Sequence, residues 1–248
     1  MAAPAGTLYW LRSCLYVAVT NKTRGLSLVG SRGPQFLMPP ESGFTPLSVE
    51  PSSAQIAEAV LDAYKTDERK KSLGADVGRT QRADGGATDP GVCFAGLGDP
   101  LLRWRDLCDA TEQIRYVHPN IPIRINTNGL LPRDDESPVA VAEALLKAGV
   151  CDATVALNAA EADAYAQLML TAPDYAPAYH ASPEEAVGDV EGGSLSAACE
   201  FVVALHEVGI QVVVSCVNRP GTNVVAVRQL ASALGAVDCK ERSWHGDE

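Results

Sequence analysis

The chain has 248 residues, of which 46% are hydrophobic, and this length suits one large α/β domain or two small ones. Its formal net charge of -11 argues against a broad nucleic-acid surface, so we expect no nucleic-acid partner. No run of about 18 apolar residues occurs, so the sequence predicts no membrane span and a soluble, acidic protein.

The seven cysteines are scattered, and no two of them form a C-x-x-C pair. An odd, dispersed set of thiols favours a reducing compartment, so we expect the protein in the cytoplasm. Residues 1–6 lack the basic region before an apolar one that marks a signal peptide. An organelle stays an alternative, because a transit peptide could have been trimmed.

Apolar runs that alternate with helical segments define the predicted architecture. The first strand, at 15–20, is followed by a polar, glycine-rich stretch over 21–43, and loops this long are usually functional or disordered. The capping-box pattern Ser52-x-x-Gln55 predicts the start of the first helix. Further strands are expected at 92–95, 121–127, 153–158, 210–218 and 237–242, and further helices at 101–117, 138–148, 161–170, 194–208 and 223–234.

This order gives six βα units, the last without its helix, and such alternation implies a parallel sheet with right-handed crossovers. We therefore predict an α/β fold, an open parallel (βα)6 partial TIM barrel, with a flat doubly wound sheet as the alternative. Residues 66–90 are charged and glycine-rich with almost no large apolar side chains, which predicts a disordered insertion. A single domain is expected to span 1–248.

The stretch Gly91–Pro100 combines a short apolar run with the sequence Gly-x-Gly-Asp-Pro. The glycines let the backbone turn tightly and expose its amides. Asp99 follows the strand at its carboxyl end, where parallel α/β proteins bind ligands. We expect this carboxylate to face solvent when no ligand is bound. A plain turn explains the same residues, because Gly, Asp and Pro are ordinary turn residues, and Asp99 would then be a helix cap.

Polar residues follow every predicted strand, whereas the strand starts are not matched in this way. The asymmetry predicts a ring of hydrogen-bonding side chains at one barrel mouth, suited to a small polar ligand. The mouth lacks the cluster of His, Asp and Glu that a hydrolytic metal site needs, so we expect no metal and assign no catalytic residue. His245 is the one histidine that could reach the mouth. The predicted cofactor-binding residues are Gly96, Gly98, Asp99, Asn126, Asn158 and Asn218.

These motifs resemble the radical S-adenosylmethionine superfamily, especially the branch linked to TatD-type nucleases. Gly98-Asp99-Pro100 looks like the end of the superfamily's Gly-Gly-Glu-Pro motif, whose backbone meets the methionine amino group of S-adenosylmethionine. Residues 125–129 are similar to a third strand that often ends in Thr-Asn-Gly, and residues 155–159 resemble the fourth strand of the TatD-linked branch. The resemblance covers the chain from about Tyr16 to Arg242.

The cluster-binding motif of the superfamily is missing. The superfamily places C-x3-C-x2-C just after the first strand, where this chain has Thr23, Ser27 and Gly30. Hydroxyl groups are poor substitutes for the thiolates that hold a [4Fe–4S] cluster, so we expect none here. S-adenosylmethionine itself stays a candidate ligand.

Two functions agree with these features. The first is a cluster-less radical-SAM-like barrel that binds a small polar molecule, such as S-adenosylmethionine or a nucleotide, or that binds a protein partner. The alternative is an active enzyme. It would be either a radical S-adenosylmethionine enzyme whose cluster ligands come from elsewhere, or an enzyme with a new cluster-independent activity. Fold does not dictate function, and the sequence leaves both open.

Overall fold

A computed structural model of the chain describes residues 2–66, 90–133 and 136–246. The insertion predicted at 66–90 lies outside the described residues, apart from its two end positions. Within these described ranges, seven strands form one sheet, and their order in space is their order in the chain. The strands are β1 (Leu8–Leu11), β2 (Cys14–Val17), β3 (Val92–Phe94), β4 (Ile123–Thr127), β5 (Asp152–Ala156), β6 (Gln211–Asn218) and β7 (Asp238–Ser243).

The sheet is parallel from β2 to β7, and β1 adds one antiparallel strand at its edge. The predicted partial barrel is therefore confirmed, with β1 as a strand that the sequence did not predict. From β2 onward, strands alternate with helices. Each crossover carries the chain back to the same end of the sheet, so successive strands run parallel.

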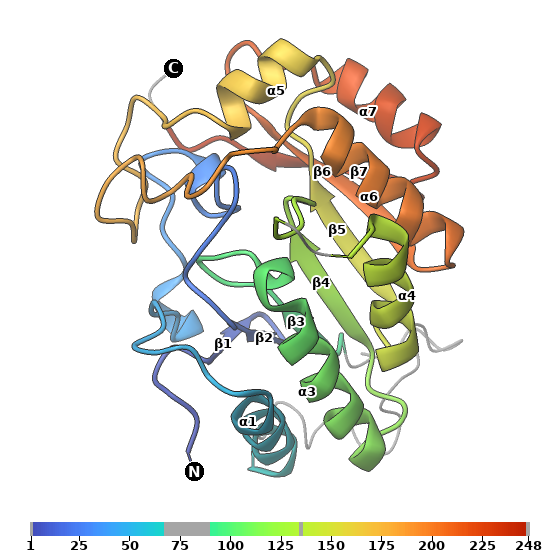
Figure 1. The fold of residues 1–248 in the computed structure, drawn as a ribbon. Coiled ribbons are helices and arrows are strands. Elements are labelled where there is room, and N and C mark those ends of the chain that lie inside the picture. The colour runs from blue at the N-terminus through green and yellow to red at the C-terminus, as the bar shows by residue number, and fades with distance from the viewer. Residues whose placement is uncertain (1, 67–89, 134–135, 247–248) are drawn as a thin grey trace, which may run out of the picture.

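The helices lie along the outer side of the sheet (Figure 1). Ser52 and Gln55 form the predicted capping box at the first helix. The Ser137 hydroxyl accepts a hydrogen bond from the amide of Ala140, and Gly149 ends that helix in a left-handed conformation. The helices are α1 (Ser53–Thr66), α3 (Trp104–Val117), α4 (Pro138–Ala148), α5 (Ala162–Met169), α6 (Leu195–Glu207) and α7 (Val224–Ala233), with the short 3-10 helices η1 (Gly30–Arg32), η2 (Pro40–Ser42) and η4 (Pro100–Arg103).

The main hydrophobic core lies between the sheet and this helical layer. Alternate residues of the inner strands, such as Phe94, Ile125 and Val155, are fully buried and belong to one cluster with helix residues such as Leu107 and Phe201. Burying these side chains contributes about 1.5–3 kcal/mol each relative to leaving them exposed. In the part of the chain that the structure describes, none of the helices has both the length and the apolar character of a membrane span.

Candidate ligand-binding site

The inner face of the sheet, opposite the helices, is polar. Successive side chains of a strand point to opposite faces, and a parallel sheet that only has to pack is apolar on both. On β4, β5 and β7 the residues that alternate with the core positions are mostly charged or polar, whereas on β2 and β3 Cys14, Tyr16 and Cys93 form a small apolar cluster. This polarity indicates a solvated binding surface on the inner face. The polar inner-face residues are Arg124, Asn126, Asp152, Thr154, Ser215, Lys240 and Arg242.

Two adjoining cavities open over the inner face. The mouth cavity, of about 150 Å³, lies toward the carboxyl ends of the strands, where Gly96, Asn126 and Asn158 line it. The basal cavity, of about 1210 Å³, lies toward the amino ends and includes Arg124 and Asp152 in its wall. The two cavities are neighbours, because both are lined by Leu11, Tyr16, Phe36, Met38, Asn126, Thr154 and Arg242.

Three of the predicted site residues therefore line the mouth cavity. They differ in whether their side chains already form hydrogen bonds within the protein. Asn158 has a left-handed φ of 60°, its Oδ1 accepts from the amide of Val217 at 2.9 Å, and its Nδ2 is 3.0 Å from the sulfur of Met169. The side chain of Asn158 therefore ties the segment after β5 to β6 and to α5. Asn126 is half-buried, and no group within the described residues forms a hydrogen bond with its side chain. Asn126 is the amide best placed to meet a ligand.

Asp99 does not face solvent, so this expectation was wrong. Its side chain is only 3% exposed and lines neither cavity. It accepts from the amide of Leu101 at 3.0 Å, from the amide of Asn128 at 2.7 Å and from the hydroxyl of Thr127 at 2.7 and 2.9 Å. Burial raises the pKa of Asp99 to about 6, against the opposing effect of these hydrogen bonds. The carboxylate caps η4 and ties it to the end of β4.

Gly98 is also explained by packing. A Cβ atom at this position would lie 2.2 Å from the carbonyl oxygen of Lys22. The amide of Gly98 donates to the carbonyl of Thr20, and the amide of Asp99 donates to that of Lys22. At Gly96, a Cβ would meet the side chain of Ala18 at 2.8 Å. Both glycines let the segment after β3 pack against the segment after β2, and only Gly96 also lines the mouth cavity.

Asn218 lies apart from the other predicted residues. It shares the outer side of β6 with the buried residues Val214 and Cys216, because side chains alternate along a strand. Its Nδ2 donates to Oε1 of Glu241 at 2.6 Å, and Asn218 is exposed. The structure therefore does not bring Asn218 to the mouth cavity.

The loop after β2 is closed by protein hydrogen bonds. The hydroxyl of Thr23 donates to the carbonyl of Gly25 at 2.9 Å. The Oγ of Ser27 accepts from the amide of Gly30 and lies 2.9 Å from Nε2 of His180, a residue whose pKa burial lowers. These contacts therefore use both hydroxyls that stand where the superfamily has its cluster-binding cysteines.

Solved structures share this architecture at low sequence identity. SuiB of Streptococcus suis aligns with 93% of this chain and 40% of its own, at 13% identity and a TM-score of 0.52. The complex of SuiB with its precursor peptide SuiA covers 93% and 39%, at 12% identity and a TM-score of 0.53. HydG, a maturase of the [FeFe]-hydrogenase, covers 93% and 42%, at 11% identity and a TM-score of 0.51.

The chain has the fold of the radical S-adenosylmethionine enzymes. It spans about two fifths of the length of the SuiB and HydG chains. No protein-family model matches the sequence, and neither does any curated protein. At these identities the likeness establishes the fold alone.

The residues after β2 do not fit the [4Fe–4S] cluster that this fold implies. Thr23 and Ser27 offer hydroxyls that are already hydrogen bonded, and Gly30 offers no side chain. Within the described residues, no group of three or more His, Cys, Asp and Glu side chains could hold a metal ion. A cluster would need thiolates at this loop, so no reaction step can be assigned through one.

S-adenosylmethionine fits the inner face only in part. The mouth cavity is smaller than the roughly 300–1,000 Å³ of typical small-molecule sites, so a nucleoside would have to reach into the basal cavity. Asn126 lies where the two cavities meet, and Tyr16 and Phe36 supply aromatic surface on the same walls. The inner face can thus hold a small polar molecule, whereas Asp99 and Gly98 are committed to the fold.

Sequence reasoning missed several residues of the mouth cavity, including Tyr9, Ser31, Arg32 and Phe36. Tyr9 belongs to the unpredicted strand β1, and the other three come from the segment after β2. Arg242 was not among the predicted cofactor-binding residues either. It is a half-buried inner-face residue, and the uniformly polar run Lys240–Ser243 gives no alternation that could have identified its side of the strand.

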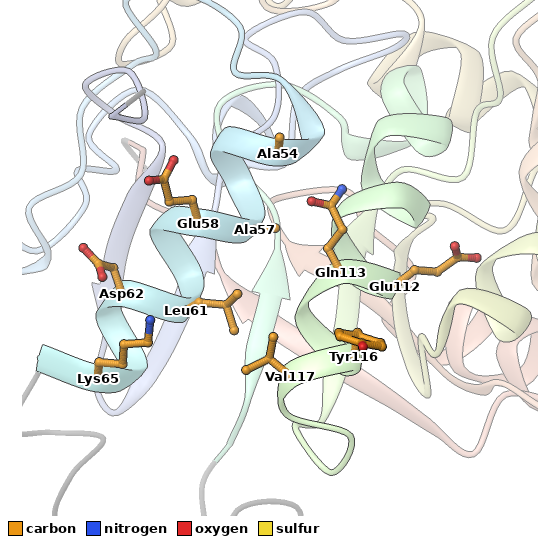
Figure 2. Close-up of a pocket in the computed structure, with 10 residues that line it drawn as sticks. All are labelled: Ala54, Ala57, Glu58, Leu61, Asp62, Lys65, Glu112, Gln113, Tyr116 and Val117. Carbon is orange, nitrogen blue, oxygen red and sulfur yellow. The ribbon is translucent and has the colours of Figure 1, made fainter.

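A separate hollow lies on the outer surface between α1 and α3 (Figure 2). Glu58 and Leu61 of α1 and Glu112, Tyr116 and Val117 of α3 line it. Tyr116 is 91% exposed there. None of the predicted site residues contributes, so this hollow is not part of the candidate site.

Proposed function

We propose that this chain is a small-molecule-binding protein that uses a radical S-adenosylmethionine fold without an iron–sulfur cluster. The ligand binds on the polar inner face of the sheet, and its proposed class is S-adenosylmethionine or a nucleotide. Placement in the TatD-linked branch is part of the same proposal and rests on the strand-end segments 125–129 and 155–159. The proposed location is the cytoplasm.

One observation carries this proposal: the loop after β2 replaces cluster ligands with side chains that hydrogen bond within the protein. Ser27, for example, is 2% exposed and is bonded to both Gly30 and His180. A loop stabilised in this way is complete without metal. The inner face nevertheless has polar residues and two cavities. A domain with a purely structural role would not need them.

The cluster half of the proposal is tested by anaerobic reconstitution with iron and sulfide. We expect no stoichiometric iron and no sulfur-to-iron charge-transfer absorbance. Incorporation of about four irons per chain would contradict the proposal, because a [4Fe–4S] cluster requires ligands that we do not assign. Such a result would favour the alternative of an active radical S-adenosylmethionine enzyme with ligands from elsewhere.

The ligand half is tested by calorimetry with S-adenosylmethionine, adenosine and AMP. Binding of one of them should be weakened by Asn126→Ala, since this amide has no hydrogen-bonding partner in the described residues. The matched control is Asn120→Ala, an exposed residue before β4. If none of the three compounds binds, the small-molecule proposal fails, and the protein-partner function remains. SuiB, which shares the fold, was solved with a bound precursor peptide.

A further inference from the structure

Two guanidinium groups face the mouth cavity without a carboxylate. Arg32 and Arg242 both line it, and every other polar residue lining it is neutral in the described part of the chain. This is unusual in a protein whose formal net charge is -11. Positive charges gathered in a concave polar site attract anions, and the surrounding low dielectric strengthens that attraction.

Arg32 is held in place by contacts that leave its charge uncompensated. Its Nε donates to the carbonyl of Ser243 at 3.0 Å, and its Nη2 lies 3.2 Å from Nε2 of His245. The guanidinium also stacks over the ring of Phe36, 4.5 Å from the centroid. None of the three partners is a carboxylate. The side chain is therefore oriented in advance of any ligand, which reduces the entropy lost on binding.

Arg242 approaches the same cavity from β7. It pairs in register with Val217 of β6 and so lies on the inner face. No residue in the described ranges forms an ion pair or a side-chain hydrogen bond with its guanidinium. Burial and the charge of Arg242 both lower the pKa of Arg32, so the two guanidinium groups repel each other. An anion between them would relieve this repulsion.

We propose that Arg32 and Arg242 bind the phosphate group of a small phosphorylated molecule in the mouth cavity. The inference rests on the proposed function and narrows its ligand to phosphate esters. A phosphate monoester carries a charge of about -1.5 to -2 at pH 7, which two guanidinium groups match, and Arg binds its oxygens through paired N–H donors. The uncommitted amide of Asn126 can donate to the same group.

The size of the cavities agrees with this assignment. The mouth cavity, about 150 Å³, has room for a phosphate and a few further atoms. The rest of the molecule would extend past Tyr16 into the basal cavity, whose wall includes Arg124 and Lys240. The basal cavity combines its cations Arg12, Arg124, Lys240 and Arg242 with two carboxylates, Glu41 and Asp152, whereas the mouth cavity has guanidinium groups and no carboxylate among the described residues.

The test is calorimetry at constant ionic strength with inorganic phosphate, AMP, adenosine and S-adenosylmethionine. Wild-type protein should bind phosphate and AMP, and Arg242→Gln should weaken both at least tenfold. Arg242→Lys, which keeps the charge but loses the paired donors, should weaken them less. The matched control Arg228→Gln removes the same charge from an exposed side chain on α7 and should leave both affinities unchanged. Circular dichroism and melting curves verify that the variants fold.

The outcomes separate this inference from the proposed function. If adenosine or S-adenosylmethionine binds but phosphate and AMP do not, the phosphate subsite is wrong while the small-molecule function stands. Equal weakening by Arg242→Gln and Arg228→Gln would also overturn the subsite, because the effect would then be one of total charge. If none of the four compounds binds, both proposals fail.

Discussion

Asp99→Ala should destabilise the protein strongly, because this carboxylate binds three donors in the interior. The substitution leaves the buried amides of Leu101 and Asn128 without acceptors. An unsatisfied buried donor costs about 1–3 kcal/mol, so the two together predict a loss of about 2–6 kcal/mol in the free energy of unfolding. Loss of the cap on η4 is contained in the Leu101 contribution.

Urea denaturation at neutral pH measures this loss, with an unchanged m-value to show that the compactness of the two states is the same. Asp99→Asn should cost less, because one oxygen remains to accept. The control Asp109→Ala, at an exposed position of α3, should stay within about 0.5 kcal/mol of wild type. If Asp99→Ala costs under about 1 kcal/mol, the internal role is refuted. The carboxylate would then be free for a ligand.

Three further predictions test the same region. Because Asp99 has a pKa of about 6 when folded against a usual 3.8, the native state holds the proton more tightly, and stability should fall as pH rises from about 4 to 6, by up to about 3 kcal/mol. Urea titrations across this range should show the slope in wild type and not in Asp99→Asn. Gly98→Ala should lose about 3 kcal/mol or more in the same assay, because its Cβ would strike a backbone carbonyl, whereas Gly221→Ala, with open space and a φ of 87°, should lose about 1. Asn158→Ala should cost about 2–4 kcal/mol, from the lost acceptor of Val217 and the left-handed φ, and Asn158→Gly should recover the strain part of this thermal or urea destabilisation.

Local signals explain why most of the fold follows from the sequence. The capping box at Ser52, the cap at Ser137 and the terminating Gly149 each act through atoms a few residues apart, and the structure contains all three. Apolar runs fixed the strands β2 to β7 because a two-sided core requires them. These features specify elements before any long-range contact is known.

Strand β1 lacked such a signal. It joins β2 through a two-residue turn at Arg12 and Ser13, with Leu11 paired to Cys14. Such turns need positive φ values and usually contain Gly or Asn, but here Arg12 takes a φ of 57°. The hairpin therefore depends on packing against the sheet. Tyr9, for example, is 2% exposed and donates to the carbonyl of Ala95.

The site was predicted less well. The prediction used only a residue's position at the end of a strand, whereas the face of the sheet to which its side chain points decides whether it reaches the cavity. Val212, Val214 and Cys216 mark the core side of β6, so Asn218, at the same parity, must point outward. That inference was possible from the sequence. The cap that Asp99 forms on η4 was the alternative that the sequence offered, but its bonds to Thr127 and Asn128 could not be predicted, since these partners lie at the end of the next strand and only the folded register brings them together.

The net charge of the chain likewise does not predict where its charged residues gather. A value of -11 argues against a broad nucleic-acid surface, but it does not say where the charges lie. The inner face carries Arg124 on β4 and both Lys240 and Arg242 on β7, and the mouth cavity adds Arg32 without an acid to balance it. Holding unpaired guanidinium groups at a half-buried surface costs stability, as the lowered pKa of Arg32 indicates. A fold that only had to pack would gain by replacing them with apolar side chains, so their arrangement is best explained by an anion that binds there.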